Sequence, residues 1–209
     1  MPARLRLTLV VATACLLAAL AIAVALGDGG GGRAGSAGGS PTGFAGALRP
    51  PAARAADFRL RDQDGRPATM RAYRGRVVVV TFLYSTCTDT CPLTAQQIRG
   101  ALDQLGRDVP VLAVSVDPAG DTAAHVRRFL AEQGMTRRMR FLTGTSAQLA
   151  PVWRAYGIRP QGDGFEHTAS TVVVDGAGRQ RLGYLTDQLT PEALAGDLRR
   201  LGAGARAGR

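Results

Sequence analysis

Two cysteines, Cys87 and Cys91, stand four positions apart in the segment FLYSTCTDTCPLT. They follow a hydrophobic stretch and precede a predicted helix. A cysteine at the start of a helix is favoured as thiolate, because the positive end of the helix dipole and unpaired N–H groups lie beside its sulfur. A thiolate is both a nucleophile and a soft metal ligand. The pair could therefore form a redox couple, hold a metal ion, or consist of two buried thiols.

The spacing of the two cysteines narrows these options. Thr88, Asp89 and Thr90 separate them, whereas thioredoxin-type oxidoreductases have two intervening residues. The longer spacing still permits a disulfide, whose Cα atoms lie within about 7 Å of each other, and it offers a wider bite to a metal ion. A carboxylate between the sulfurs disfavours two adjacent thiolates unless a cation lies between them. The spacing permits redox chemistry and favours metal binding.

Histidine supplies a third candidate ligand. His167 lies in GFEHTASTVVVD, a polar loop directly before a predicted buried strand, and His125 lies among arginines on a predicted helix, where we expect it to face solvent. Two thiolates and one imidazole form a soft site that suits Cu(I) and tolerates Cu(II) if a weak fourth ligand joins. A structural zinc site needs four protein ligands, and no third cysteine is available outside the apolar N-terminal segment.

The hydrophobic pattern predicts strands that alternate with helices, and these elements position the candidate residues. The predicted strands are residues 76–83, 109–116 and 171–175, the helices are residues 93–105, 122–133, 147–156 and 191–201, and hairpins are predicted around Asp64-Gly65 and Gly176–Gly178. This order indicates an α/β fold with a mixed central sheet flanked by helices. Cysteines at the carboxyl end of the first central strand are typical of a thioredoxin-like fold, and open α/β sheets usually carry their site at that edge.

The first 26 residues determine the expected compartment. Two arginines precede the apolar run Leu7–Leu26, whose length of about 20 residues suffices for one N-terminal membrane helix. We expect the rest of the chain on the extracytoplasmic side of the cell membrane. A cleaved signal peptide, with small residues at Ala23 and Ala25, and lipidation at Cys15 are the alternatives. All three place the cysteine pair in an oxidising space, where it becomes a disulfide unless it is kept reduced or metallated.

Composition indicates how the exported part is organised. Residues 27–51 include GDGGGGRAGSAGGSPTG and are expected to form a flexible linker. Residues 52–203 are expected to form the thioredoxin-like domain and residues 204–209 a tail. The 26 basic side chains are all arginine and, against 16 acidic ones, leave a net charge of +10. They are scattered and not interleaved with aromatic residues, so we expect no nucleic acid as a partner.

The motifs DQDGRP, VVVVTFLYSTCTDTCPLT, VSVDPAGDT, FLTG, YGI and HTASTVVVD occur in an order and spacing that resemble the Sco (SenC) family over about Asp57–Leu201. The resemblance implies a membrane-tethered, thioredoxin-fold copper chaperone. Its partner would be the copper-accepting subunit of cytochrome c oxidase, whose binuclear copper centre it helps to assemble. The resemblance also implies that Cys87, Cys91 and His167 bind copper, and that Asp117 supports the site from nearby.

Two functions remain open at this point. In the first, the chain delivers copper to its acceptor by ligand exchange and is not a classical enzyme. In the second, it is a thiol-disulfide reductase for the acceptor's cysteines, in which Cys87 attacks and Cys91 resolves the mixed disulfide. His167 separates the two, because copper binding needs its nitrogen and disulfide exchange does not. Glu166 stands where the family often has aspartate, a departure that leaves the three ligands unchanged.

Overall fold

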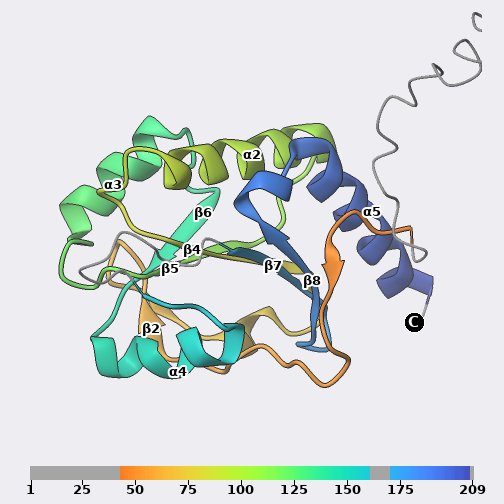
Figure 1. Ribbon diagram of the computed structural model, residues 1–209, viewed down its shortest axis with the longest axis horizontal. Coiled ribbons are helices and arrows are strands. Elements are labelled where there is room, and N and C mark those ends of the chain that lie inside the picture. Colours follow the sequence, from red (N-terminus) through yellow and green to blue (C-terminus); the bar gives the residue numbers. More distant parts are fainter. Residues whose placement is uncertain (1–42, 161–169, 208–209) are drawn as a thin grey trace, which may run out of the picture. The chain divides into compact units, whose positions relative to one another are not determined.

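A six-stranded mixed sheet forms the centre of the protein in a computed structural model that describes residues 43–160 and 170–207 (Figure 1). The strand order is β1-β8-β7-β4-β5-β6, in which β4, β5 and β6 run parallel and the other neighbours pair antiparallel. The strands are β1 (Ala47–Leu48), β4 (Val78–Leu83), β5 (Val111–Ser115), β6 (Met139–Leu142), β7 (Ser170–Val174) and β8 (Gln180–Leu185). The predicted mixed sheet is confirmed.

Helices cover both faces of this sheet, as the continuous apolar strands predicted. One face carries α2 (Thr90–Leu105), α3 (Ala123–Glu132) and α5 (Pro191–Ala207). The other carries α4 (Ser146–Tyr156), the hairpin of β2 (Leu60–Arg61) and β3 (Pro67–Ala68), and the 3-10 helix η1 (Met70–Tyr73), while η2 (Thr186–Gln188) leads into α5. Figure 1 shows α2, α3 and α5 on one side and α4 on the other.

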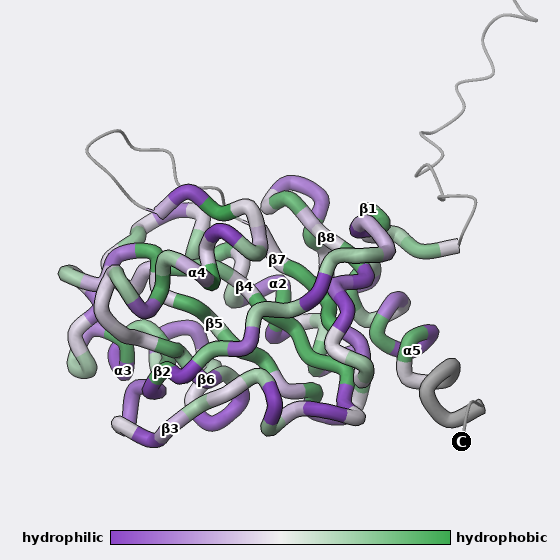
Figure 2. Tube along the Cα trace, turned by 90° about the horizontal axis from the view of Figure 1, so that it is seen from below, coloured by the Kyte–Doolittle hydropathy of each residue, from purple (hydrophilic) through white to green (hydrophobic). Residues whose placement is uncertain are grey.

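Strand β4 contributes to both hydrophobic cores. Val79 and Leu83 belong to the core beneath α2 and α5, whereas Val80 and Phe82 belong to the core beneath α4. This alternation follows from the two-residue period of a strand. Hydrophobic residues consequently run along the central strands, and hydrophilic ones gather in the outer connections (Figure 2). The strand that leads to the cysteines is therefore fixed from both sides.

Two element boundaries differ from those predicted. Helix α2 begins earlier, at Thr90, because the carboxylate of Asp89 accepts the Thr90 N–H and caps the helix. Pro92 fits in this first turn, where its missing N–H leaves no bond unmade. Helix α5 continues to Ala207, so the predicted tail of residues 204–209 is wrong over most of its length. Its alanines, the strongest helix formers, favour the helix in spite of its three glycines.

The predicted linker of residues 27–51 is wrong at its C-terminal end. β1 pairs with β8, and the N–H groups of Ala45 and Gly46 donate to the carboxylate of Asp197, which is 2% exposed. A buried carboxylate needs such donors, and the backbone of this segment supplies them. A Cβ on Gly46 would lie 2.7 Å from the Tyr184 ring, so this glycine is required by packing. Composition alone gave no sign of either contact.

The predicted membrane helix and the rest of the linker lie outside the described residues. Within residues 43–160 and 170–207, no helix has the length and hydropathy needed to cross a membrane.

Candidate metal and redox centre

The loop after β4 holds Cys87 at the carboxyl edge of the sheet. A turn closes between the Cys87 N–H and the Tyr84 carbonyl at 3.4 Å, and Asp89 then starts α2. Cys91 consequently lies in the first turn of α2. The sequence predicted both cysteines at the junction of strand and helix, ahead of a helix at residue 93, and the earlier start of α2 places Cys91 inside the helix.

The Cys87 sulfur is surrounded by hydrogen-bonding groups. The Cys91 N–H donates to it at 3.3 Å, the Thr90 hydroxyl lies 3.7 Å away, and Asp89 Oδ1 lies 3.2 Å away, a contact in which the sulfur donates only while it is protonated. The two cysteines are not joined in a disulfide, and Cys87 is 6% exposed whereas Cys91 is fully buried. Reagents and metal ions therefore reach Cys87 first.

The two thiols have opposite electrostatic character. A hydrogen bond from the Cys91 side chain lowers the pKa of Cys87 to about 5, and the N–H groups of Asp89 and Cys91 add to this although burial opposes it. The hydrogen bond with Cys87, together with burial, raises the pKa of Cys91. At neutral pH the pair therefore consists of one thiolate and one thiol. The thiolate suits nucleophilic attack and metal capture alike.

Alkylation of the reduced, metal-free protein tests this asymmetry. Because only the thiolate reacts, the rate at Cys87 should rise with pH, reach half its maximum at about pH 5, and be level above pH 7. In Cys91→Ala the stabilising hydrogen bond is gone, so the half-maximal rate should move upward toward the ordinary cysteine pKa of about 8.5. Mass spectrometry locates the modified residue. A wild-type rate that still climbs between pH 8 and 9 would contradict the assignment.

Two neighbours of the pair were missed in the sequence. Burial raises the pKa of Tyr84, and a hydrogen bond with Cys87 adds to that shift. Asp121 is 5% exposed and accepts hydrogen bonds from Ser85 and Ser115, and burial raises the pKa of its carboxyl group. Tyr84 directly follows a buried strand and Asp121 directly precedes a helix. Neither position distinguishes them from ordinary loop residues.

Asp117, which the family resemblance implicated, makes a different contact. Its carboxylate accepts the Gly120 N–H at 3.0 Å and so closes the turn after β5. A Cβ on Gly120 would come within 2.2 Å of this carboxylate, so the turn requires glycine there. Asp117 also raises the pKa of Asp121 through charge repulsion. The structure thus places Asp121, rather than Asp117, against the loop that carries Cys87.

His167 lies outside the described residues. The strand after it, β7, runs antiparallel to β4 with Thr171 opposite Thr81, so its first residue, Ser170, lies at the carboxyl edge of β4. In the part of the chain that the structure describes, no group of three or more His, Cys, Asp or Glu side chains is arranged to hold a metal ion. The other histidine, His125, is half-buried and its Nδ1 lies 2.9 Å from the Gly120 carbonyl.

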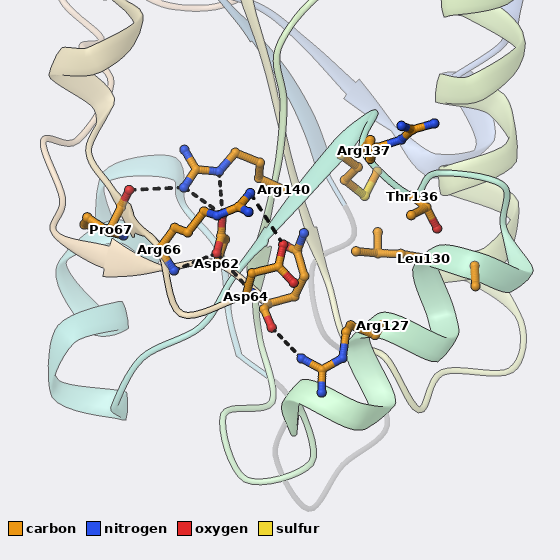
Figure 3. Close-up of a pocket in the computed structure, with 12 residues that line it drawn as sticks. Asp62, Asp64, Arg66, Pro67, Arg127, Leu130, Thr136, Arg137 and Arg140 are labelled. Carbon is orange, nitrogen blue, oxygen red and sulfur yellow. Dashed lines mark hydrogen bonds and ion pairs between the residues drawn. The ribbon is translucent and has the colours of Figure 1, made fainter.

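A separate pocket of about 730 Å³ opens between the β2–β3 hairpin, α3 and β6 (Figure 3). Among the described residues, no cysteine or histidine lines it. Arg140 spans one wall, bonded to Asp62 at 2.8 Å and to the Pro67 carbonyl at 3.1 Å, and Arg127 donates to the Gln63 carbonyl at 2.9 Å. The guanidinium groups of Arg140 and Arg127 are thus engaged in contacts within the fold, and the cysteine pair is the stronger candidate for the reactive centre.

Comparison with known proteins identifies relatives. A sequence model described as SCO1/SenC matches residues 46–203. The chain is 33% identical over 117 residues to the bovine mitochondrial SCO2 homolog, an alignment that covers 54% of this chain and 43% of that protein. It is 32% identical over 151 residues to SenC of Rhodobacter capsulatus, covering 66% of each chain. The chain thus spans 43% to 66% of the length of these relatives.

Solved structures share the fold. Bradyrhizobium japonicum ScoI, solved with copper bound, is 31% identical and superposes with a TM-score of 0.61 over 71% of this chain and 99% of its own. Yeast Sco1 is 19% identical, with a TM-score of 0.65 over 74% of this chain and 97% of its own, and therefore supports the fold alone. These matches confirm the predicted thioredoxin-like fold for the described domain.

Proposed function

The chain belongs to the SCO1/SenC family, and on that premise we propose that it binds copper and delivers it to the binuclear copper centre during assembly of cytochrome c oxidase. The copper ion is its cargo. Cys87 and Cys91 provide two sulfur ligands and His167 a neutral nitrogen. The partner is the copper-accepting subunit of the oxidase, which takes the ion by ligand exchange.

The observation that carries this proposal is the pair of sulfurs at the start of α2. Cys87 is already a thiolate near neutral pH, so it can capture a cation directly. Cys91, whose N–H lies 3.3 Å from the Cys87 sulfur, is close enough to join the same ion after losing its proton. The nearby carboxylates of Asp89 and Asp121 favour a cation here. Sulfur donors select Cu(I) over harder metals.

His167 is the proposed third ligand because of where its strand begins. Two residues separate it from Ser170, and the three Cα–Cα steps between them span at most about 11 Å. Ser170 lies at the same edge of the sheet as the cysteine loop. The proposal also includes the N-terminal membrane helix of residues 1–26, which would hold the domain on the extracytoplasmic side, where its acceptor is assembled.

Copper titration of the reduced protein tests the sulfur ligands. The wild-type chain should bind one equivalent of copper, and its Cu(II) form should show strong sulfur-to-metal charge-transfer absorption. Cys87→Ser and Cys91→Ser each remove one sulfur and should each abolish that absorption and weaken Cu(I) binding more than about 100-fold, since even residues behind a ligand cost 10- to 100-fold. Full binding by either variant would refute the two-sulfur site.

A second function, thiol-disulfide reduction, is favoured by the asymmetry between the two thiols. The Cys87 thiolate would attack the acceptor's disulfide and release one acceptor thiolate, forming a mixed disulfide. Cys91, after losing its proton, would then attack Cys87, so that the second acceptor thiol leaves and the Cys87–Cys91 disulfide forms. The protein is oxidised and the acceptor reduced by the same two electrons. A disulfide switch was identified in BsSco, a member of the Sco family of cytochrome c oxidase assembly proteins that shares this fold.

A further inference from the structure

The carboxylate of Asp121 joins the end of β5 to the loop that carries Cys87. Its Oδ1 accepts both the N–H and the hydroxyl of Ser85, each at 2.6 Å, and its Oδ2 accepts the hydroxyl of Ser115 at 2.5 Å. All three bonds are short for hydrogen bonds of their type. One side chain therefore connects β5 to the loop that follows β4, the strand beside it in the sheet.

Asp121 is fixed on its core side. Ser115 belongs to β5, and its carbonyl accepts the indole N–H of Trp153 at 2.9 Å. Trp153 is packed in the core beneath α4. The Asp121 N–H donates to the Asp117 carbonyl at 3.0 Å, and Thr122 then caps α3. The carboxylate thus projects from a framework that cannot move without disturbing the core.

The loop that Asp121 contacts, which carries Ser85 and Cys87, has fewer contacts of its own. Ser85 lies two residues before Cys87, and both hydrogen bonds that the structure shows for it end on Asp121. The residues on either side of Cys87, Thr86 and Thr88, are exposed. The loop is also held by the long Tyr84–Cys87 turn bond and by the Cys91 N–H that donates to the Cys87 sulfur, and the Asp121 carboxylate supplies the two contacts at Ser85.

We infer that Asp121 is the positioning residue of the copper site, which holds the loop of residues 84–87 through Ser85 so that the Cys87 sulfur stands in front of α2. The inference rests on the proposed function. Groups that orient a metal ligand commonly change affinity 10- to 100-fold when removed. Because the role is to hold the loop, it depends on hydrogen-bond acceptance rather than on charge. Asparagine, which keeps an acceptor oxygen toward Ser85, should preserve it.

Four variants of the full-length chain test this, on a Cys15→Ser background that leaves Cys87 and Cys91 as the only thiols. Asp121→Ala removes the acceptor, Asp121→Asn keeps it, and Ser85→Ala removes one bond from the loop side. Asp175→Ala is the matched control, since the Asp175 carboxylate likewise accepts hydrogen bonds within the fold, from two backbone N–H groups at 2.9 and 3.0 Å, but in the β7–β8 turn.

Hydrogen–deuterium exchange of the metal-free chain measures the loop directly. The peptide that covers residues 84–91 should exchange at least tenfold faster in Asp121→Ala and in Ser85→Ala than in the wild type. Asp121→Asn and Asp175→Ala should exchange at the wild-type rate in this peptide. If Asp121→Ala does not fold, Ser85→Ala still tests the contact from the loop side, because it removes the hydroxyl bond to Asp121. Wild-type exchange in both loop variants would overturn the inference.

Copper binding supplies the second measurement. Asp121→Ala should bind Cu(II) about 10- to 100-fold more weakly, with a shifted charge-transfer band, and Asp121→Asn should restore both. If Asp121→Asn loses as much Cu(II) affinity as Asp121→Ala, the charge of Asp121 matters and its position does not. If Asp175→Ala loses as much Cu(II) affinity, the effect is a general destabilisation of the fold. Either result refutes the inference. If the wild type binds no copper, the proposed function fails while the exchange measurement still decides the positioning role.

Discussion

His167→Ala is expected to lower Cu(II) affinity by more than about 100-fold and to remove the sulfur-to-copper charge-transfer absorption. The imidazole is the only nitrogen in the proposed ligand set, and Cu(II) binds two thiolates alone poorly. Weaker Cu(I) binding through the two sulfurs should persist. The cysteine pair should also remain redox-active, because neither sulfur needs the imidazole to form or exchange a disulfide.

The same variant separates copper delivery from thiol reduction in cells. Cells that carry His167→Ala should assemble cytochrome c oxidase poorly at limiting copper and recover when copper is supplied in excess. His125→Ala is the matched control, since it removes the only other histidine from a site on α3 and should leave assembly unchanged. Normal assembly by His167→Ala, with failure of Cys87→Ser, would replace copper delivery by thiol reduction.

The fold was predictable from the sequence where the hydrophobic pattern was unambiguous. The run Val78–Leu83 is apolar and β-branched, which predicted a strand covered on both faces, and the start of a helix at a cysteine pair indicated the thioredoxin-like placement. Both features are local, so composition and spacing report them. The order of elements then limited the topology to a mixed sheet.

The surroundings of the cysteines were not predictable in the same way. Asp121 is four residues beyond Asp117, and both are aspartates after the same strand. Only the direction of each side chain decides which one meets Ser85 and which one closes a turn on Gly120. The large difference in pKa between two neighbouring thiols likewise comes from hydrogen bonds across the first turn of α2. Such contacts depend on three-dimensional placement that no spacing rule contains.

Removing the segment before Ala52 is expected to destabilise the domain, contrary to what its glycine-rich composition suggested. The chain that begins at residue 52 lacks β1 and the N–H groups of Ala45 and Gly46, so the buried Asp197 carboxylate retains only the Tyr184 hydroxyl among these partners. Breaking the contacts of a buried charge costs about 3 to 5 kcal/mol. Urea unfolding should show a free energy of unfolding lower by about 3 kcal/mol than for the chain that begins at residue 43.

Two substitutions in the longer chain show whether the loss arises from these contacts. Gly46→Ala forces a Cβ against the Tyr184 ring and should destabilise the domain by about 1 to 3 kcal/mol. Leu48→Ala changes a side chain of β1 that is 50% exposed, so its effect should stay within about 0.5 kcal/mol. Equal free energies of unfolding for the chains that begin at residues 43 and 52 would show that residues 43–51 are part of the linker, as the sequence predicted. A large effect of Leu48→Ala would instead locate the stabilisation in β1 itself, because the N–H donors to Asp197 are unchanged in that variant.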